Sequence, residues 1–231
     1  MEHLGETLVQ ALLPARCLLC NCSLPWRSSG GVCAGCWAQL PRLEAPRCPT
    51  CGEPSAQSPC LACAKDPPPW QRLVAVFLYE SQAKQLVPAF KNGHDTLAKP
   101  LAQRLLTQLQ QNQFPGFFTV TFVPMRRWRL VRRGYNQAEL LARELAKQAQ
   151  WDFQPLLRRI AGGSQKGLSR SARKAQMVSS FLSARTVPPR VLLVDDVVTT
   201  GATAAACCKA LRKGGAREIW VAAVAKTPRR R

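Results

Sequence analysis

The chain has 231 residues, of which 46% are hydrophobic, so it is long and apolar enough to bury one large core or two smaller ones. Its formal net charge of +20 favours polyanionic partners, nucleic acid above all. No apolar run reaches the length of a membrane span, and the acidic first residues lack the features of a secretory signal, so we expect a cytoplasmic protein.

The positive charge is confined to the second part of the chain. Residues 1–70 contain five of the 33 Lys and Arg residues and five of the 13 Asp and Glu residues. The rest of the chain therefore carries the whole excess of +20. We expect nucleic acid to bind this second part, whereas affinity for ribosomes or phosphometabolites, or simple solubility, is the alternative explanation.

Pairs of cysteines mark the first part. Nine of the 11 Cys lie between Cys17 and Cys63, and eight of these form four CxxC pairs. The pairs are Cys17/Cys20, Cys33/Cys36, Cys48/Cys51 and Cys60/Cys63. Two such pairs supply the thiolates of a tetrahedral zinc site, and zinc would add the folding energy that these short segments lack. We therefore expect residues 1–66 to form a double zinc-ribbon module with two zinc ions; disulfides are the weaker option in the cytoplasm.

The assignment of the four pairs to two sites is open. Either sequential or crossed pairing closes two sites, and Cys22 is a spare thiol that could serve as an alternative ligand. Cys207 and Cys208 fall in a later helix, where we expect small core residues and no ligands.

A proline-rich spacer, Asp66–Trp70, predicts a boundary before a second domain of residues 71–231. After it, Arg72–Tyr79 has the β-branched and aromatic composition of a strand. Ser81–Lys91 and Thr96–Gln111 predict two helices, and we expect His94, in the turn between them, to have no catalytic role.

A dense basic run follows the next predicted strand, Phe117–Val123, and precedes a predicted helix, Asn136–Gln148. Its arginines are Arg126, Arg127, Arg129, Arg132 and Arg133. Trp128 and Tyr135 are interleaved with them, and arginines beside aromatic rings suit phosphate binding and base stacking. We expect a loop that binds DNA here, with a merely solvated basic loop as the alternative.

The segments Leu156–Ile160 and Val178–Leu182 predict a pair of short strands. Between them, Gly162–Lys174 is rich in Gly, Ser, Lys and Arg and resembles a lid or a nucleic-acid-binding loop more than core. Arg217–Ala225 predicts a last buried strand, before a basic tail at Arg229–Arg231.

The strongest signal is Val191–Thr203, with the sequence VLLVDDVVTTGAT. Val191–Val194 predicts a buried parallel strand, with Asp195 and Asp196 past its end, and Ala202–Leu211 predicts a helix. The short polar loop before this helix directs backbone N–H groups and the positive helix end at one point, which suits a phosphate. Two acids make sense there if they accept hydrogen bonds from sugar hydroxyls, directly or through magnesium.

This pattern resembles the fingerprint of the type I phosphoribosyltransferases: an apolar strand, two acids, two apolar residues and T-T-G-x-T. The resemblance implies an α/β fold with a parallel sheet flanked by helices. It also implies that Asp195 and Asp196 hold the ribose hydroxyls, and that the loop wraps the 5′-phosphate. The loop residues are Thr199, Thr200, Gly201, Ala202 and Thr203. The basic run would then bind pyrophosphate, and magnesium would accompany the phosphoribosyl ligand. An ordinary turn between strand and helix is the alternative.

Across nearly the whole chain, the order of parts resembles the ComF family, which includes the GntX-type DNA-utilization proteins. The residues that carry the resemblance are the four CxxC pairs, Val123-Pro124, Arg133–Gln137, Gln165, Leu168-Ser169, Arg173 and Val191–Thr203. Where members commonly have Asn three residues after the arginine at 173, this chain has Gln176. The resemblance implies a role in competence or in the use of extracellular DNA as a nutrient, with a competence helicase or ATPase as a further partner.

Two functions follow from these features. The first is a DNA-handling protein that binds single-stranded DNA together with a phosphoribosyl or nucleotide phosphate group. The second is an active phosphoribosyltransferase that transfers ribose phosphate from phosphoribosyl pyrophosphate to a base or amine. The sequence contains no glutaminase nucleophile and no evident base-binding hood, and it identifies no catalytic residue. The basic second domain favours the DNA role.

Overall fold

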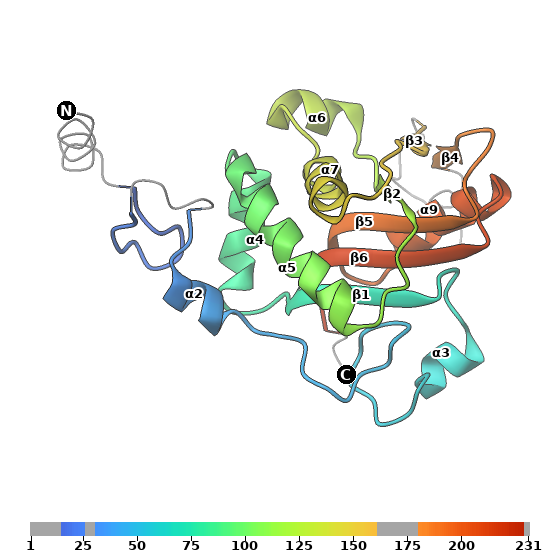
Figure 1. Ribbon diagram of the computed structural model, residues 1–231, viewed down its shortest axis with the longest axis horizontal. Helices are drawn as coiled ribbons and strands as arrows, with labels where there is room; N and C mark the ends of the chain where they lie inside the picture. Colours follow the sequence, from blue (N-terminus) through green and yellow to red (C-terminus); the bar gives the residue numbers. More distant parts are fainter. Residues whose placement is uncertain (1–14, 26–30, 161–179, 229–231) are drawn as a thin grey trace, which may run out of the picture.

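The computed structural model describes residues 15–25, 31–160 and 180–228, and its elements are labelled in Figure 1. The predicted segment Gly162–Lys174 and the basic tail lie outside the described residues. The same holds for four residues of the family resemblance and for Gln176; the four are Gln165, Leu168, Ser169 and Arg173.

A four-stranded sheet of order β1-β6-β5-β2 forms the centre of the molecule. Its strands are β1 (Arg72–Leu78), β2 (Thr119–Phe122), β5 (Arg190–Val198) and β6 (Glu218–Lys226). All neighbouring strands pair in parallel. β5 and β6 are nearly continuous apolar runs because both of their faces are covered, as is usual in parallel sheets.

Helices cover both faces of the sheet (Figure 1). On one face lie α4 (Ala83–Lys91), α5 (Ala98–Gln111) and α7 (Gln137–Ala149), with the short turn η1 (Asp95–Leu97) between the first two. On the other face lies α9 (Ala202–Lys213), whose Cys207 and Cys208 are fully buried. The predicted α/β class, a parallel sheet flanked by helices, is confirmed.

β5 differs from the prediction at the two acids. We expected Asp195 and Asp196 past the end of the strand, but β5 continues to Val198. The reason is that β6 pairs with β5 as far as Val198, whereas β2 pairs with it only as far as Val194. Both acids therefore lie in the part of β5 that extends beyond β2.

The basic run also differs from the prediction, because it forms the helix α6 (Arg127–Arg133) and no loop. Arg, Leu and Trp tolerate a helix, and Gly134 ends it in the left-handed conformation, with φ 80° and its N–H donating to the Leu130 carbonyl. Within this fully described helix no side chain is buried, and Val131 is 85% exposed. The short strands β3 (Leu157–Arg159) and β4 (Phe181–Ser183) pair antiparallel, as predicted.

The two cysteine-rich ribbons pack directly on the sheet domain. The first contains α2 (Ala34–Gln39), whose Trp37 stacks on Phe77 of β1 at 6.3 Å and lies under the guanidinium of Arg104 at 3.7 Å. The second contains α3 (Leu61–Lys65), and its Pro49 carbonyl accepts from the N–H of Leu73 at 3.0 Å. Among the described helices, none combines the length and apolar character needed to cross a membrane.

Candidate functional site

The eight predicted ligands form two separate quartets of sulfur atoms. The first is Cys17, Cys20, Cys33 and Cys36, and the second is Cys48, Cys51, Cys60 and Cys63. The ligand atoms of each quartet lie within 4.8 Å of one another. The sulfur atoms of Cys20 and Cys33, and those of Cys51 and Cys60, are 3.7 Å apart, close to the spacing of about 3.8 Å in a tetrahedron with zinc–sulfur bonds of about 2.3 Å. The pairing is therefore sequential, and Cys22 belongs to neither quartet.

Backbone N–H groups lower the pKa of the first thiol in each quartet. The N–H of Cys33 donates to the Cys17 sulfur at 3.3 Å, and that of Cys60 donates to the Cys48 sulfur at 3.4 Å. Burial would raise the pKa of both thiols, but these donors and others from their own turns bring the pKa of each down to about 6. The thiolate form, which zinc binds, is thereby favoured.

We expect about two zinc ions per chain, one in each quartet. Replacing Cys17 and Cys20 by Ser should remove one ion, and replacing Cys48 and Cys51 by Ser should remove the other. Cys22→Ser is the matched control and should leave the content unchanged, because Cys22 lies outside both quartets. Metal analysis of the purified full-length chain checks this, and a loss of zinc in the Cys22 variant would contradict the assignment.

The two predicted acids line a pocket of about 210 Å³, here called the acid pocket. It lies at the carboxyl end of β5 and is closed by the start of α7 and one side of α6. Its cationic residues are Lys91, Arg126, Arg129, Arg133 and Arg159. In open parallel α/β sheets, ligands bind at the carboxyl ends of the strands, so this is the expected position for a ligand.

Asp195 and Asp196 differ in environment. Asp195 is buried, and this burial, followed by the charge of neighbouring Asp196, raises the pKa of its carboxyl group well above the ordinary value. Its Oδ1 accepts the backbone N–H of Asp196 at 2.8 Å. Asp196 is partly exposed, and its Oδ2 lies 2.5 Å from the ammonium of Lys91.

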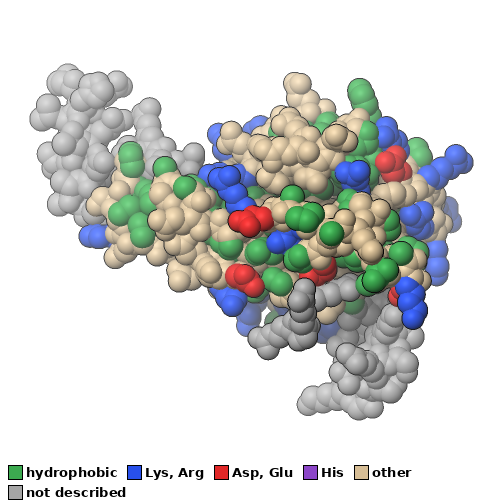
Figure 2. Space-filling model, turned by 90° about the horizontal axis from the view of Figure 1, so that it is seen from below, with side chains coloured by type: hydrophobic (Ala, Val, Ile, Leu, Met, Phe, Trp, Pro, Cys, Tyr) green, Lys and Arg blue, Asp and Glu red, His purple; other side chains and the backbone are tan. Residues whose placement is uncertain are grey.

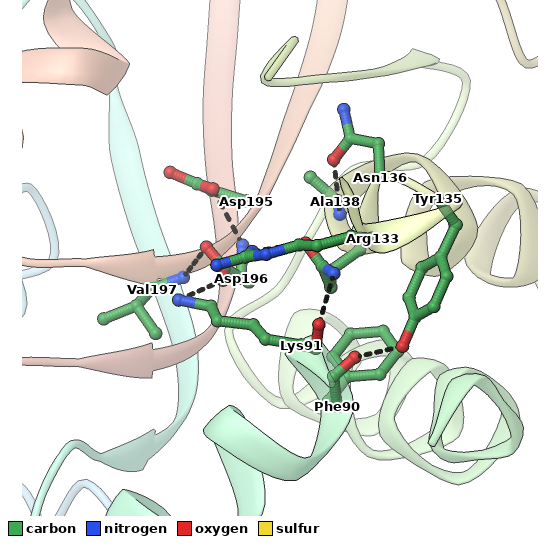
Figure 3. Close-up of polar contacts among 10 residues, drawn as sticks. Phe90, Lys91, Arg133, Tyr135, Asn136, Ala138, Asp195, Asp196 and Val197 are labelled. Carbon is green, nitrogen blue, oxygen red and sulfur yellow. Dashed lines mark hydrogen bonds and ion pairs between the residues drawn. The ribbon is translucent and has the colours of Figure 1, made fainter. Parts of the chain in front are cut away.

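Lys91 and Arg133 extend toward Asp196 from α4 and α6 (Figure 3). Arg133 also donates to the Oε1 of Gln137 at 3.2 Å. Asn136 begins α7, because its side chain accepts the N–H of Ala138 at 3.1 Å and donates to the Val123 carbonyl at 3.1 Å. The start of α7 is thereby fixed beside the acids. Lys91 neutralises the charge of Asp196, so the two acids by themselves are a weak site for magnesium. Magnesium remains a prediction, and it would bind together with a phosphoribosyl ligand.

The five predicted arginines, of which Arg126 caps α6 and the other four lie within it, divide into two groups. Arg126, Arg129 and Arg133 lie three to four residues apart, so they share one side of the helix, and all three line the acid pocket. Arg127 and Arg132 do not line it. Trp128 is 54% exposed and lies beside the guanidinium groups of Arg129 and Arg132 at 5.2 and 5.7 Å.

Tyr135 is held in place by the fold. Its hydroxyl donates to the Phe90 carbonyl at 2.7 Å (Figure 3). The same hydroxyl accepts the Gly93 N–H at 3.1 Å. It therefore fixes the turn after α4, and Trp128 is the better candidate for stacking on a base.

The predicted phosphate loop lies between the acid pocket and a second pocket. Thr203 lines the acid pocket, whereas Thr199, Thr200, Gly201 and Ala202 line the second one. Gly201 begins α9 with φ 78°, a conformation that suits glycine, and a Cβ atom built there would lie only 3.0 Å from the Trp70 ring. The loop is therefore in tight contact with the residue that follows the second ribbon.

Sequence reasoning missed Lys91 and Arg159 as members of the site. The sequence predicted Lys91 as the last residue of a helix, before a turn, and Arg159 as part of a short strand. Burial, and then the charges of Arg126 and Arg129, lower the pKa of Arg159, which shows how closely the cationic groups are gathered. No local motif marks either residue, since only the tertiary fold brings them to β5.

Comparisons with known proteins agree with this organisation. Residues 8–65 match the family described as a double zinc ribbon domain. Over 225 residues, the chain is 33% identical to the DNA utilization protein YhgH of Escherichia coli (strain K12), covering 93% of this chain and 98% of that protein. It is 33% identical to Competence protein F of Haemophilus influenzae, over 91% of this chain and 96% of the relative. It is 27% identical to Competence protein ComFC of Streptococcus pneumoniae, over 81% of this chain and 84% of that protein.

Proposed function

This chain belongs to the ComF family, that of DNA utilization protein YhgH and Competence protein F, and from this premise we propose that it handles single-stranded DNA in competence or in the use of DNA as a nutrient. In this proposal the DNA strand binds along α6. The acid pocket binds one sugar phosphate, either from the DNA or from a free nucleotide. The zinc ribbons serve as a structural module beside that site.

The observation that carries the proposal is the charge of the acid pocket. Five cationic side chains surround two acids, and one of those acids is held toward its neutral form by burial. Such an excess suits a ligand with several negative charges. Lys and Arg side chains are also more widespread than Asp and Glu on the face shown in Figure 2, which supports attraction of a polyanion.

Each group has a role in the proposal. Asp195 and Asp196 accept hydrogen bonds from sugar hydroxyls, while the loop at the start of α9 holds the phosphate. Arg126, Arg129 and Arg133 contact further phosphates, and Trp128 stacks on a base. Phosphoribosyl transfer from phosphoribosyl pyrophosphate is the second candidate, favoured by the acids lying beside that same loop.

The test is the salt dependence of single-stranded DNA binding. If about four phosphates are engaged, log K should fall against log salt with a slope of about −3, at about −0.7 per phosphate. Replacing Arg126, Arg129 and Arg133 by Ala should reduce the slope by about 2 and abolish binding of phosphoribosyl pyrophosphate. Replacing Arg127 and Arg132 by Ala is the matched control: it should weaken DNA binding and leave phosphoribosyl pyrophosphate binding intact, because these residues lie outside the pocket.

The outcomes separate the two functions. The phosphoribosyltransferase function would be supported if the wild-type chain had no DNA affinity at low salt and released pyrophosphate from phosphoribosyl pyrophosphate in the presence of a nucleobase. A chain that binds neither DNA nor phosphoribosyl pyrophosphate would refute both.

A further inference from the structure

A second pocket, here called the ribbon pocket, lies between the second zinc ribbon and the start of α9. Its volume is about 550 Å³, within the range of roughly 300–1,000 Å³ typical of small-molecule sites. The ribbon contributes α3, the sheet domain contributes the residues from Val198 to Ala202, and the proline-rich spacer joins the two sides. Apart from the phosphate loop and the zinc ligands Cys51 and Cys63, the residues that line it have no function assigned above.

The walls of the ribbon pocket are mainly apolar. They are formed by the spacer Pro67–Pro69, Trp70, Leu73, Ala62 and Ala205. Flat rings and small side chains of this kind accommodate a planar, weakly polar group such as a nucleobase.

The rim of the ribbon pocket is cationic. Lys65 and Lys209 line it, and within the described part of the chain neither forms an ion pair. Lys226 also lines it, but its ammonium lies 2.6 Å from the Glu53 carboxylate and is thereby neutralised. Asp66 is the acid among the lining residues, so the two free lysines and the positive end of α9 leave an excess of positive charge.

The ribbon pocket and the acid pocket share the phosphate loop as a common wall. Val198–Ala202 face the ribbon pocket, and Thr203 faces the acid pocket. A phosphate held by this loop therefore lies between the two, with one substituent directed to the acids and the other to the ribbon.

Nucleic-acid stereochemistry then fixes the direction of a bound strand. A sugar whose 3′-hydroxyl is bound by Asp195 and Asp196 has no nucleotide attached there, so it is the 3′-terminal sugar. Its 5′-phosphate, held by the loop, connects it to the preceding nucleoside. We propose that the ribbon pocket binds this penultimate nucleoside, so that the chain holds the 3′ end of a single strand. The inference rests on the proposed function and names the part of the DNA that this site takes.

Recognition in the ribbon pocket depends on ring contacts and charge. The base packs against the apolar walls, and Lys65 and Lys209 attract the next phosphate toward the 5′ end. The apolar walls offer contacts that any base can make, so we expect little sequence preference.

The test compares two small ligands on the full-length, zinc-loaded chain. The first is the dinucleotide thymidylyl-(3′→5′)-thymidine. The second is the methyl ester of thymidine 5′-phosphate, which has the same single negative charge but lacks the penultimate nucleoside. We expect the dinucleotide to bind about tenfold more tightly, as is typical of one well-packed base. A 3′-phosphate on the dinucleotide should abolish binding.

Two pairs of variants locate the effect. Ala62→Trp fills the ribbon pocket, whereas Ala64→Trp places the same ring on α3 outside it. Lys209→Glu reverses a charge at its rim, whereas Lys213→Glu makes the same change one turn further along α9. Ala62→Trp should lose the tenfold advantage of the dinucleotide, and Ala64→Trp should keep it. A 5′-phosphate added to the dinucleotide should increase its affinity further, and this gain should be lost in Lys209→Glu and kept in Lys213→Glu. All four should bind phosphoribosyl pyrophosphate as the wild type does.

The results distinguish this inference from the proposed function. Equal affinity of the wild type for both ligands, or an advantage of the dinucleotide that survives Ala62→Trp, would overturn the ribbon-pocket inference alone. Tight binding of the 3′-phosphorylated dinucleotide would refute the 3′-end orientation. If the wild type binds neither small ligand nor phosphoribosyl pyrophosphate, the proposed function itself fails.

Discussion

Replacing Asp195 by Asn is expected to stabilise the fold at neutral pH and to weaken ligand binding at the same time. Asp195 is buried on β5, and burial, followed by the charge of Asp196, raises the pKa of its carboxyl group well above the ordinary value. An Asn side chain cannot ionise, and its oxygen can still accept the Asp196 N–H that Asp195 accepts at 2.8 Å.

The direction of the pH effect follows from proton linkage. Because the folded pKa lies above the unfolded one, the folded chain holds more protons than the unfolded chain between these two values. The free energy of unfolding therefore falls as the pH rises through that window. Asp195→Asn should flatten this fall, so the difference in melting temperature from the wild type should grow between about pH 4 and the raised pKa.

Thermal melts across this pH range check the prediction, with binding of phosphoribosyl pyrophosphate measured in parallel. Asn replaces one carboxyl oxygen by an NH₂ group, which cannot accept from a sugar hydroxyl. Binding should therefore weaken by up to about tenfold, since a hydrogen bond between neutral groups contributes about 0.5–1.5 kcal/mol. Asp196→Asn is the matched control, because it removes the ion pair with Lys91 and should not stabilise the fold. A melting temperature of Asp195→Asn below that of the wild type at pH 8 would contradict the assignment.

Local patterns in the sequence predicted those parts of the site that lie on one continuous segment. The strand, the two acids, the loop and the helix of Val191–Thr203 follow from apolar composition and turn residues, and the structure has them in that order. The error about where β5 ends has a physical cause. A strand ends where its partners end, and β6, which keeps β5 extended past the acids, is a distant segment.

The parts that escaped prediction depend on tertiary contacts. Lys91 gains its importance only because α4 ends beside β5, so that its ammonium meets Asp196. The pairing of the CxxC motifs was open for the same kind of reason, since spacing alone allows both arrangements. The helix α6 was predicted as a loop because its arginines and interleaved aromatic rings suggested a loop that binds DNA, although no residue within it breaks a helix.

Replacing Trp70 by Ala is expected to lower the free energy of unfolding by about 3–5 kcal/mol and to weaken phosphate binding as well. Trp70 is 7% exposed and connects the second zinc ribbon to the phosphate loop. Its indole N–H donates to the carbonyl of Thr50 at 2.7 Å, between the ligands Cys48 and Cys51. The other edge of its ring lies against Gly201.

Trp70 therefore supports both the second zinc quartet and the phosphate loop. The loop residue Gly201 has no side chain to restrict its backbone, so the conformation of the loop depends on the Trp70 ring that packs against it. Without the indole, the loop loses its packing and the turn between Cys48 and Cys51 loses a hydrogen bond. We therefore expect faster zinc release to a chelator from the second quartet, together with lower affinity for phosphoribosyl pyrophosphate.

Two variants distinguish this specific role of Trp70 from a general loss of stability. Trp70→Phe keeps most of the ring and loses the hydrogen bond to Thr50, so it should cost only about 1 kcal/mol and retain most of the ligand affinity. Trp37→Ala removes a tryptophan of the first ribbon, which packs on Phe77 and Arg104 away from the phosphate loop. It should lower the melting temperature without changing zinc release from the second quartet or the affinity of the folded chain for its ligand. Equal weakening of ligand binding by Trp37→Ala and Trp70→Ala would contradict a specific role of Trp70. The conformation of the phosphate loop would then be determined by β5 and α9 alone.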